Sequence, residues 1–176
     1  VDGSVPAIFI TASDTHPLAP SVDVAIDANQ EAFQMGVRAL NKLTDGEVFL
    51  CAMQNSTVTS TDCKVEVFDG PHPAGTPGFH IHTIMPVNRK RAAWYIGYQD
   101  VIAIGHLLST GKLYTDRVVS LAGPAVKDPR LVKTRRGACT LALTDGQLKA
   151  GENRVIAGSV LGGRTAGCDV QGYLGR

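Results

Sequence analysis

Three of the chain's five histidines lie in one short stretch, GPHPAGTPGFHIH, which covers positions 70–82. If this segment is extended, His80 and His82 are two residues apart and share one face, a workable arrangement for two ligands of one metal ion. A metal site needs further ligands, and only His72 and Asp69 are near in sequence. The stretch therefore leaves two interpretations open: a metal-dependent enzyme, or hydrogen-bonded histidines in a rigid loop.

The same stretch is poorly suited to binding a phosphate group. Its glycines, at positions 70, 75 and 78, match neither of the two common glycine-rich nucleotide-binding patterns. Its three prolines lack the backbone N–H groups with which such loops bind oxygen atoms. Because proline also fixes φ, the sequence predicts a loop that holds a defined shape.

A second candidate lies where a predicted strand, 93–96, meets a predicted helix, 98–109. The free N–H groups of a first helical turn commonly bind anions. Asp100 falls in that turn, where its carboxylate would satisfy those groups and repel a phosphate. The turn is therefore either a helix that caps itself or part of a pocket in which Tyr98, Gln99 and Asp100 contact an uncharged ligand.

The composition excludes some classes of protein. Of 176 residues, 44% are hydrophobic and 19% charged, which is typical of a folded domain. Seventeen basic residues against sixteen acidic ones, with 6% aromatics, predict no nucleic-acid partner. The four cysteines form no C-x-x-C pair, which argues against iron–sulfur or zinc ligation. Cys51 lies in an apolar run and is expected to be a buried, reduced thiol of a reducing compartment.

We expect no signal peptide, and no apolar run approaches the roughly 18 residues of a membrane span. We therefore expect a soluble chain. Basic residues cluster at 89–91 and 127–136. Each cluster is either a solvated surface or a docking face for an acidic partner or an anionic membrane.

The first part of the chain alternates strands and helices. Strands are predicted at 7–12, 47–53, 64–68 and 93–96, and helices at 29–43 and 98–109. In the first helix Phe33, Val37 and Leu40 share one face. Asp27 with Gln30 resembles a capping box, and Gly46 suits the C-terminal cap. A strand–helix–strand order predicts a parallel crossover.

The remainder has a different pattern. Strands are predicted at 117–123, 130–134 and 154–161, with a short helix at 140–143. This order suggests a small ubiquitin-like β-grasp. The sequence therefore predicts an α/β protein with two domains, a parallel α/β domain at 1–112 and a small β-grasp domain at 113–176.

Long ungapped blocks of the sequence resemble one family, the A subunits of sodium-translocating NADH:quinone oxidoreductases. These blocks are 70–82, 97–105, 113–119, 121–124, 128–132, 158–161 and 173–176. The likeness covers nearly the whole chain. The family in turn is similar to the C subunit of the Rnf complex and to the flavin-binding subunit of respiratory complex I. Those proteins pair a Rossmann-like domain with a soluble-ligand-binding β-grasp (SLBB) domain. The resemblance therefore implies a Rossmann-like domain at 1–112 and an SLBB-like β-grasp domain at 113–176 that is incomplete at its C-terminal end.

The resemblance implies a peripheral subunit on the cytoplasmic face of a bacterial inner-membrane complex. That complex passes electrons from NADH to ubiquinone and drives sodium outward. The implied partners are the other subunits of the complex, with ubiquinone as a candidate ligand. The whole complex uses flavins and iron–sulfur centres.

The flavin-binding relatives carry a glycine-rich nucleotide loop and clustered cysteine ligands, and this sequence has neither. We therefore expect no FMN, NADH or iron–sulfur cluster in this chain, no metal and no catalytic residue, but a scaffold near the quinone-reducing end. The alternative is a flavin- or dinucleotide-binding redox domain. The residues placed nearest the quinone are His80, His82, Tyr98, Gln99 and Asp100.

Overall fold

The computed structural model describes residues 5–166, which divide into two compact units. One, here called the α/β unit, contains the residues up to 15 and residues 21–114. The other, here called the C-terminal unit, contains residues 16–20 and the chain from 115 onward. The α/β unit has one four-stranded sheet and the C-terminal unit has two two-stranded sheets, and each unit is therefore described by itself.

Four parallel strands form the sheet of the α/β unit: β1 (Ala7–Ala12), β2 (Glu47–Met53), β3 (Lys64–Phe68) and β4 (Trp94–Gly97). Their order across the sheet is β3-β2-β1-β4. The central strands β1 and β2 are buried on both faces, as their continuous apolar sequences require in a parallel sheet. The strands β1 to β3 begin and end where the sequence predicts.

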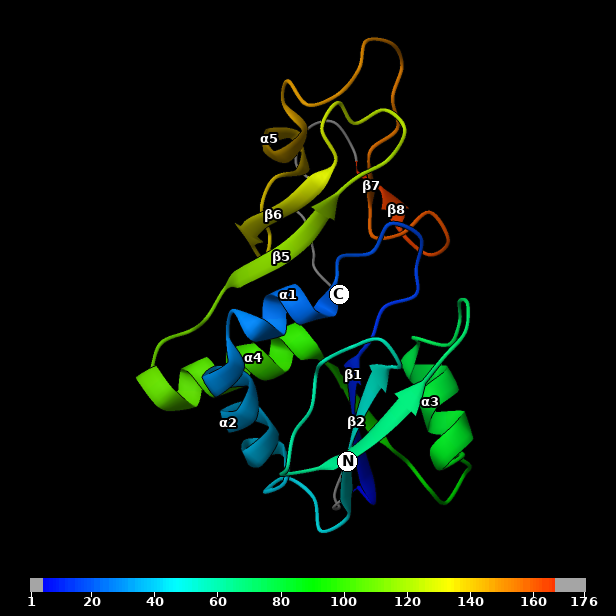
Figure 1. The fold of residues 1–176 in the computed structure, drawn as a ribbon, viewed down its shortest axis with the longest axis vertical. Helices are drawn as coiled ribbons and strands as arrows, with labels where there is room; N and C mark the ends of the chain where they lie inside the picture. Colours follow the sequence, from blue (N-terminus) through cyan, green and yellow to red (C-terminus); the bar gives the residue numbers. More distant parts are fainter. Residues whose placement is uncertain (1–4, 167–176) are drawn as a thin grey trace. The chain divides into compact units, whose positions relative to one another are not determined.

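Helices cover both faces of this sheet (Figure 1). On one side lie α1 (Val22–Asp27), α2 (Gln30–Leu40) and α4 (Tyr98–Thr110); on the other lies α3 (Pro77–Ile84). Phe9 and Phe49 stack with centroids 5.1 Å apart in the cluster that receives Ile81 of α3. The α/β class with a parallel sheet is confirmed.

Helices α2 and α4 pack with their backbones close together because each presents a glycine. A Cβ on Gly105 would lie 1.7 Å from the carbonyl oxygen of Ala32, and one on Gly36 would lie 2.2 Å from that of Val101. No side chain other than hydrogen fits at either position. Sequence periodicity identified both helices, but this close contact is a tertiary feature.

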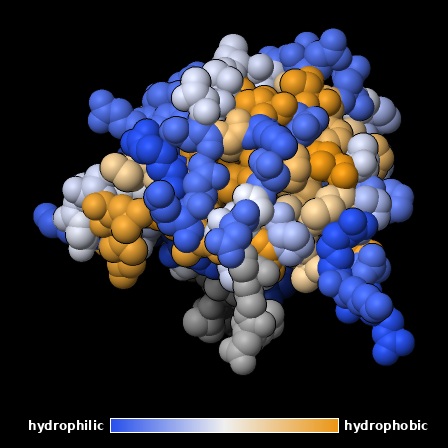
Figure 2. Space-filling model, turned by 90° about the horizontal axis from the view of Figure 1, so that it is seen from below, coloured by the Kyte–Doolittle hydropathy of each residue, from blue (hydrophilic) through white to orange (hydrophobic). Residues whose placement is uncertain are grey.

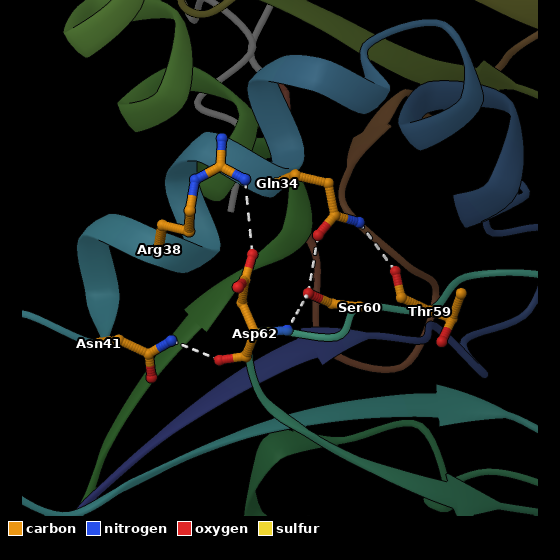
Figure 3. A network of polar contacts seen from close by, with 6 residues as sticks. All are labelled: Gln34, Arg38, Asn41, Thr59, Ser60 and Asp62. Carbon is orange, nitrogen blue, oxygen red and sulfur yellow. Dashed lines mark hydrogen bonds and ion pairs between the residues drawn. The ribbon is translucent and has the colours of Figure 1, made fainter.

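A loop rather than a helix connects β2 to β3. Residues 54–63 run beside α2, whose polar face holds them (Figure 3). Gln34 donates to the Thr59 carbonyl at 2.9 Å and accepts from the Ser60 hydroxyl at 2.7 Å, and Asn41 donates to the Asp62 carbonyl. Parallel strands are usually joined through a helix, so this polar network replaces the packing that such a helix supplies.

The other end of this loop is bound by one carboxylate. Asp23 accepts hydrogen bonds from the Ser56 hydroxyl at 2.7 Å and from the Thr57 backbone N–H at 2.9 Å. Partial burial alone would raise the pKa of Asp23, but these hydrogen bonds outweigh it and lower the pKa. The loop is therefore held best when Asp23 is ionised.

Three expectations for the α/β unit are wrong in detail. The helix predicted at 29–43 spans only Gln30–Leu40. Asp27 ends a separate helix, α1, so it forms no capping box with Gln30. Gly46 does not cap α2, whose C-cap is Asn41; the backbone of Gly46 instead approaches Pro6, whose carbonyl oxygen would lie 2.0 Å from an added Cβ. Cys51 is free and buried, as expected, and burial raises its pKa to about 12.

The C-terminal unit is built from short elements. An antiparallel pair, β5 (Asp116–Leu121) and β6 (Arg130–Arg135), is followed by α5 (Thr140–Thr144). A small hairpin then joins β7 (Ile156–Ala157) to β8 (Arg164–Thr165). The predicted strand 154–161 is wrong except at Ile156–Ala157, because the chain turns at Gly158, where φ is +98°.

Candidate functional site

The carboxyl edge of the parallel sheet is the natural place for a site in the α/β unit. From β1 the chain crosses to β2 on one side, whereas β4 pairs with β1 on the other side. The two strands end together, with Thr11 opposite Gly97. Open α/β sheets bind ligands outside the carboxyl ends of their strands at such a change of direction. The candidate site therefore consists of the segments that follow β1 and β4.

The segment after β1 is bound to the histidine-containing loop, residues 69–76. The Ser13 hydroxyl donates to the Gly75 carbonyl at 3.4 Å, and the Gly75 N–H donates to the Thr15 hydroxyl at 3.0 Å. His72 Nδ1 lies 3.3 Å from the same hydroxyl. A Cβ on Gly75 would approach the Thr15 nitrogen to 2.8 Å. Glycine at this position is what allows the loop to lie so close to the end of β1.

His80 anchors this loop from inside the protein. Its side chain is fully buried, and its Nε2 lies 2.8 Å from the Ala74 carbonyl oxygen. Since a carbonyl only accepts, geometry assigns the proton to Nε2. Burial lowers the pKa of His80, against the smaller opposing effect of the bond to Ala74. His80 is therefore a neutral hydrogen-bond donor, and its ring packs against that of Phe68 in a tilted arrangement, with centroids 4.3 Å apart.

The expected pairing of His80 and His82 on one face is wrong. The segment is the helix α3, not an extended strand, and two residues along a helix correspond to about 200° of rotation. His80 accordingly points into the core, whereas His82 is exposed. Among residues 5–166 no group of three or more His, Cys, Asp or Glu side chains is arranged to hold a metal ion, so the metal-dependent enzyme gains no support from the geometry.

The segment after β4 begins a helix directly. Gly97 is the N-cap of α4, and Asp100 lies in the first turn, where its charge complements the helix dipole. The Tyr98 side chain is buried, and its hydroxyl accepts a hydrogen bond from the Gln99 amide at 3.2 Å. Gln99 and Asp100 are half-buried. These two side chains are the predicted site residues that a ligand at this turn could reach.

Sequence reasoning missed Ser13 and Thr15, which make the contacts to the loop. A usable signal existed, because both hydroxyls follow directly after a strongly apolar strand, at the sheet edge where ligands bind. What the sequence could not show is that residues 69–76, some 60 positions later, lie against them.

Comparison with known proteins agrees with this architecture. Residues 1–113 match the family model described as NqrA second alpha/beta domain, and residues 118–167 match the model described as NQRA C-terminal domain. The whole chain is 54% identical over 179 residues to the A subunit of the Na(+)-translocating NADH-quinone reductase of Tolumonas auensis. It is 53% identical over 178 residues to the protein of the same name in Vibrio alginolyticus, and covers 40% of each relative.

Fold and family models together define a Rossmann-like α/β domain followed by an SLBB-type β-grasp domain. The chain belongs to the NqrA family, which comprises the A subunits of Na⁺-translocating NADH-quinone reductases. It spans about 40% of the length of these curated relatives. Within residues 5–166, no helix is long and apolar enough to cross a membrane.

Proposed function

We propose that this chain forms part of a peripheral subunit of a sodium-pumping NADH:ubiquinone reductase, in which it is a scaffold near the quinone-reducing end and holds no redox cofactor of its own. The observation that carries the proposal is the occupied carboxyl edge of the sheet. There the protein's own loop, 69–76, lies against the end of β1. A Rossmann-like domain that binds a nucleotide keeps that place open for the ligand.

The helix that follows β1 supports the same interpretation. Dinucleotide-binding domains place the pyrophosphate at the N-terminus of a helix directly after a glycine-rich turn. Here the turn contains Pro17 and Pro20, and the helix α1 has six residues with Asp23 in its first turn. Missing N–H groups and a nearby carboxylate both disfavour a phosphate.

A quinone needs a different site from a phosphate. Its carbonyl oxygens are neutral acceptors, so the site must supply hydrogen-bond donors. At the start of α4 the amide of Gln99 carries N–H donors and is half-buried. The exposed His82 is a further donor, while the buried His80 acts by holding the loop in place. We place the quinone-proximal surface at Tyr98, Gln99 and Asp100, on the cytoplasmic face of the complex.

The test uses the only tryptophan, Trp94, which lies four residues before Tyr98 and is 43% exposed. Its fluorescence is titrated with a short-chain ubiquinone and, separately, with FMN, with inner-filter controls. We expect saturable quenching by the quinone, weakened by Gln99→Ala and unchanged by a matched exposed substitution, Gln30→Ala. Two outcomes would contradict the proposed scaffold role: saturable quenching by FMN, or NADH:quinone reductase activity of the chain alone. Either would favour a flavin- or dinucleotide-binding redox domain.

A second test addresses assembly. We expect the chain to associate with the other subunits of the reductase, since the proposed scaffold acts only within the complex. Co-purification with membranes that contain those subunits, compared with membranes that lack them, measures this directly. Equal recovery from both would contradict the proposed partners.

A further inference from the structure

Hydrophobic residues reach the surface in several places between hydrophilic side chains, as the face in Figure 2 shows. One such place is a sheet edge. β4 is the last strand of the sheet and pairs only with β1 among the described residues. It begins with Trp94, 43% exposed, and Tyr95, 63% exposed. An open sheet edge with two exposed aromatic side chains is a template for pairing with another strand.

The opposite edge of the same sheet is protected by charge. β3 carries Lys64 and Glu66 within the strand, and Lys64 forms an ion pair with Glu47 at 3.1 Å. Charged side chains on an edge strand discourage pairing with another chain. β4, with the sequence WYIG, has no charged residue. The difference indicates that β4, unlike β3, carries no charged side chain that would discourage pairing with a strand of another polypeptide.

A rigid basic turn precedes this edge. Asn88 and Arg91 exchange two backbone hydrogen bonds of 3.0 and 3.2 Å, and the Arg91 guanidinium donates to the Pro86 carbonyl through both Nε and Nη2. The turn thereby projects Arg89 and Lys90, which are exposed. The sequence from Pro86 to Tyr95 contains no acidic residue. The local charge is therefore positive, and the hydrogen bonds of Arg91 hold the turn that carries it.

We propose that the β4 edge binds an extended, acidic segment of a partner polypeptide as an additional strand. The partner's backbone pairs with the open edge of β4, its apolar side chains cover Trp94 on one face of the sheet and Tyr95 on the other, and its carboxylates, beyond the paired residues, face Arg89 and Lys90. This inference concerns docking and does not depend on quinone binding.

Strand geometry favours a peptide over a lipid surface. Trp94 and Tyr95 are consecutive in a strand, so their side chains point to opposite faces of the sheet. A flat membrane surface covers one face, whereas an added strand alternates in the same way and covers both. The open backbone groups of the edge also need hydrogen-bond partners, which hydrocarbon lacks.

The experiment uses a capped peptide with four consecutive valines, one for each residue of β4, flanked on both sides by glutamates. Binding is followed by Trp94 fluorescence and by amide hydrogen exchange of residues 94–97. We expect a saturable blue shift and slower exchange at β4, with no slowing at the β3 edge. A peptide in which lysine replaces glutamate, and vesicles of phosphatidylcholine with and without phosphatidylglycerol, are titrated in parallel.

Matched variants test the charge and the location. The double substitution R89E/K90E is expected to weaken binding of the acidic peptide at least tenfold, and Lys42→Glu, an exposed lysine just beyond α2, to leave it unchanged. No change in β4 exchange with the acidic peptide would overturn the proposal. So would equal binding of the lysine peptide, or a blue shift caused only by phosphatidylglycerol vesicles, which would assign the surface to lipid.

Discussion

The two units are stabilised in different ways. In the α/β unit the strands β1 and β2 and the helices α2 and α4 enclose a continuous set of buried side chains, including Phe9 and Phe33. In the C-terminal unit the buried hydrophobic side chains, among the described residues, are Val119 and Val126. A parallel sheet with helices on both faces buries its strands completely, whereas a two-stranded ladder leaves much of its surface in water.

Polar contacts take a larger share in the C-terminal unit. The Lys127 N–H donates to the Gln147 carbonyl and the Lys149 N–H to the Ala125 carbonyl, both at 2.8 Å. The ammonium groups of the same lysines donate to the Gly146 and Pro124 carbonyls, also at 2.8 Å. Apolar burial therefore dominates the stability of the first unit, while a seam of hydrogen bonds between residues 124–130 and 145–149 holds the second.

The largest expected effect comes from truncating the core of the α/β unit. Phe33→Ala removes a fully buried ring and should reduce the free energy of unfolding by about 3–5 kcal/mol. Val119→Ala in the C-terminal unit should cost only about 1.5 kcal/mol, at roughly 0.8 kcal/mol for each buried methylene-sized group. Urea unfolding, followed by amide hydrogen exchange in each unit separately, measures both changes. Equal losses of unfolding free energy in the two variants would contradict the proposed difference between the units.

Two glycines extend the same contrast. Gly105→Ala forces a Cβ against the Ala32 carbonyl and should separate α2 from α4, at a cost of about 3 kcal/mol. The control is Gly146→Ala in the C-terminal unit, where φ is +65° and the space around the Cβ is open. That change should cost about 1–2 kcal/mol from backbone strain alone. Thermal unfolding of the two variants shows which substitution is more destabilising. A smaller effect at position 105 than at position 146 would show that α2 and α4 can separate at little cost.

Asp23 tests how much a polar contact contributes to the α/β unit, whose stability comes mainly from apolar burial. Asp23→Ala removes the acceptor for Ser56 and Thr57 and should cost about 1 kcal/mol, a value reduced for solvent exposure. Because the folded pKa is lowered, its contribution is present above the unfolded pKa of about 3.9 and is lost as pH falls through the folded value. The variant should therefore show a shallower acid unfolding curve. A curve parallel to that of the unsubstituted chain would argue against the contact.

The smallest expected effect is a pH dependence from His80. Its folded pKa is lowered, so stability is fully present above the unfolded pKa of about 6.5 and falls as pH drops from there toward the folded value. Comparing His80→Asn with the unsubstituted chain isolates this contribution from the other four histidines. We expect the variant to be less stable at neutral pH but to lose less stability on acidification. An unchanged slope would mean that His80 is not held neutral.

Local sequence signals were enough to predict the strands β1 to β3, the helices α2 and α4 and the parallel α/β class. These elements follow from apolar runs, helical spacing and glycine breaks, which a single segment carries. Family resemblance was also readable, because it rests on contiguous blocks. The short helix α1 escaped notice because six residues give little periodicity.

The roles of the histidines, by contrast, depend on tertiary contacts. Residues 77–84 contain a proline and a glycine and resemble a loop, yet Pro77 is the first residue of a helix, where its missing N–H costs nothing. The helix turns His80 inward to Ala74 and Phe68 and leaves His82 in solvent. Likewise, the contacts of Ser13 and Thr15 with the loop at 69–76 join segments some 60 residues apart. Such contacts depend on how the sheet brings distant chain segments together, which local sequence does not encode.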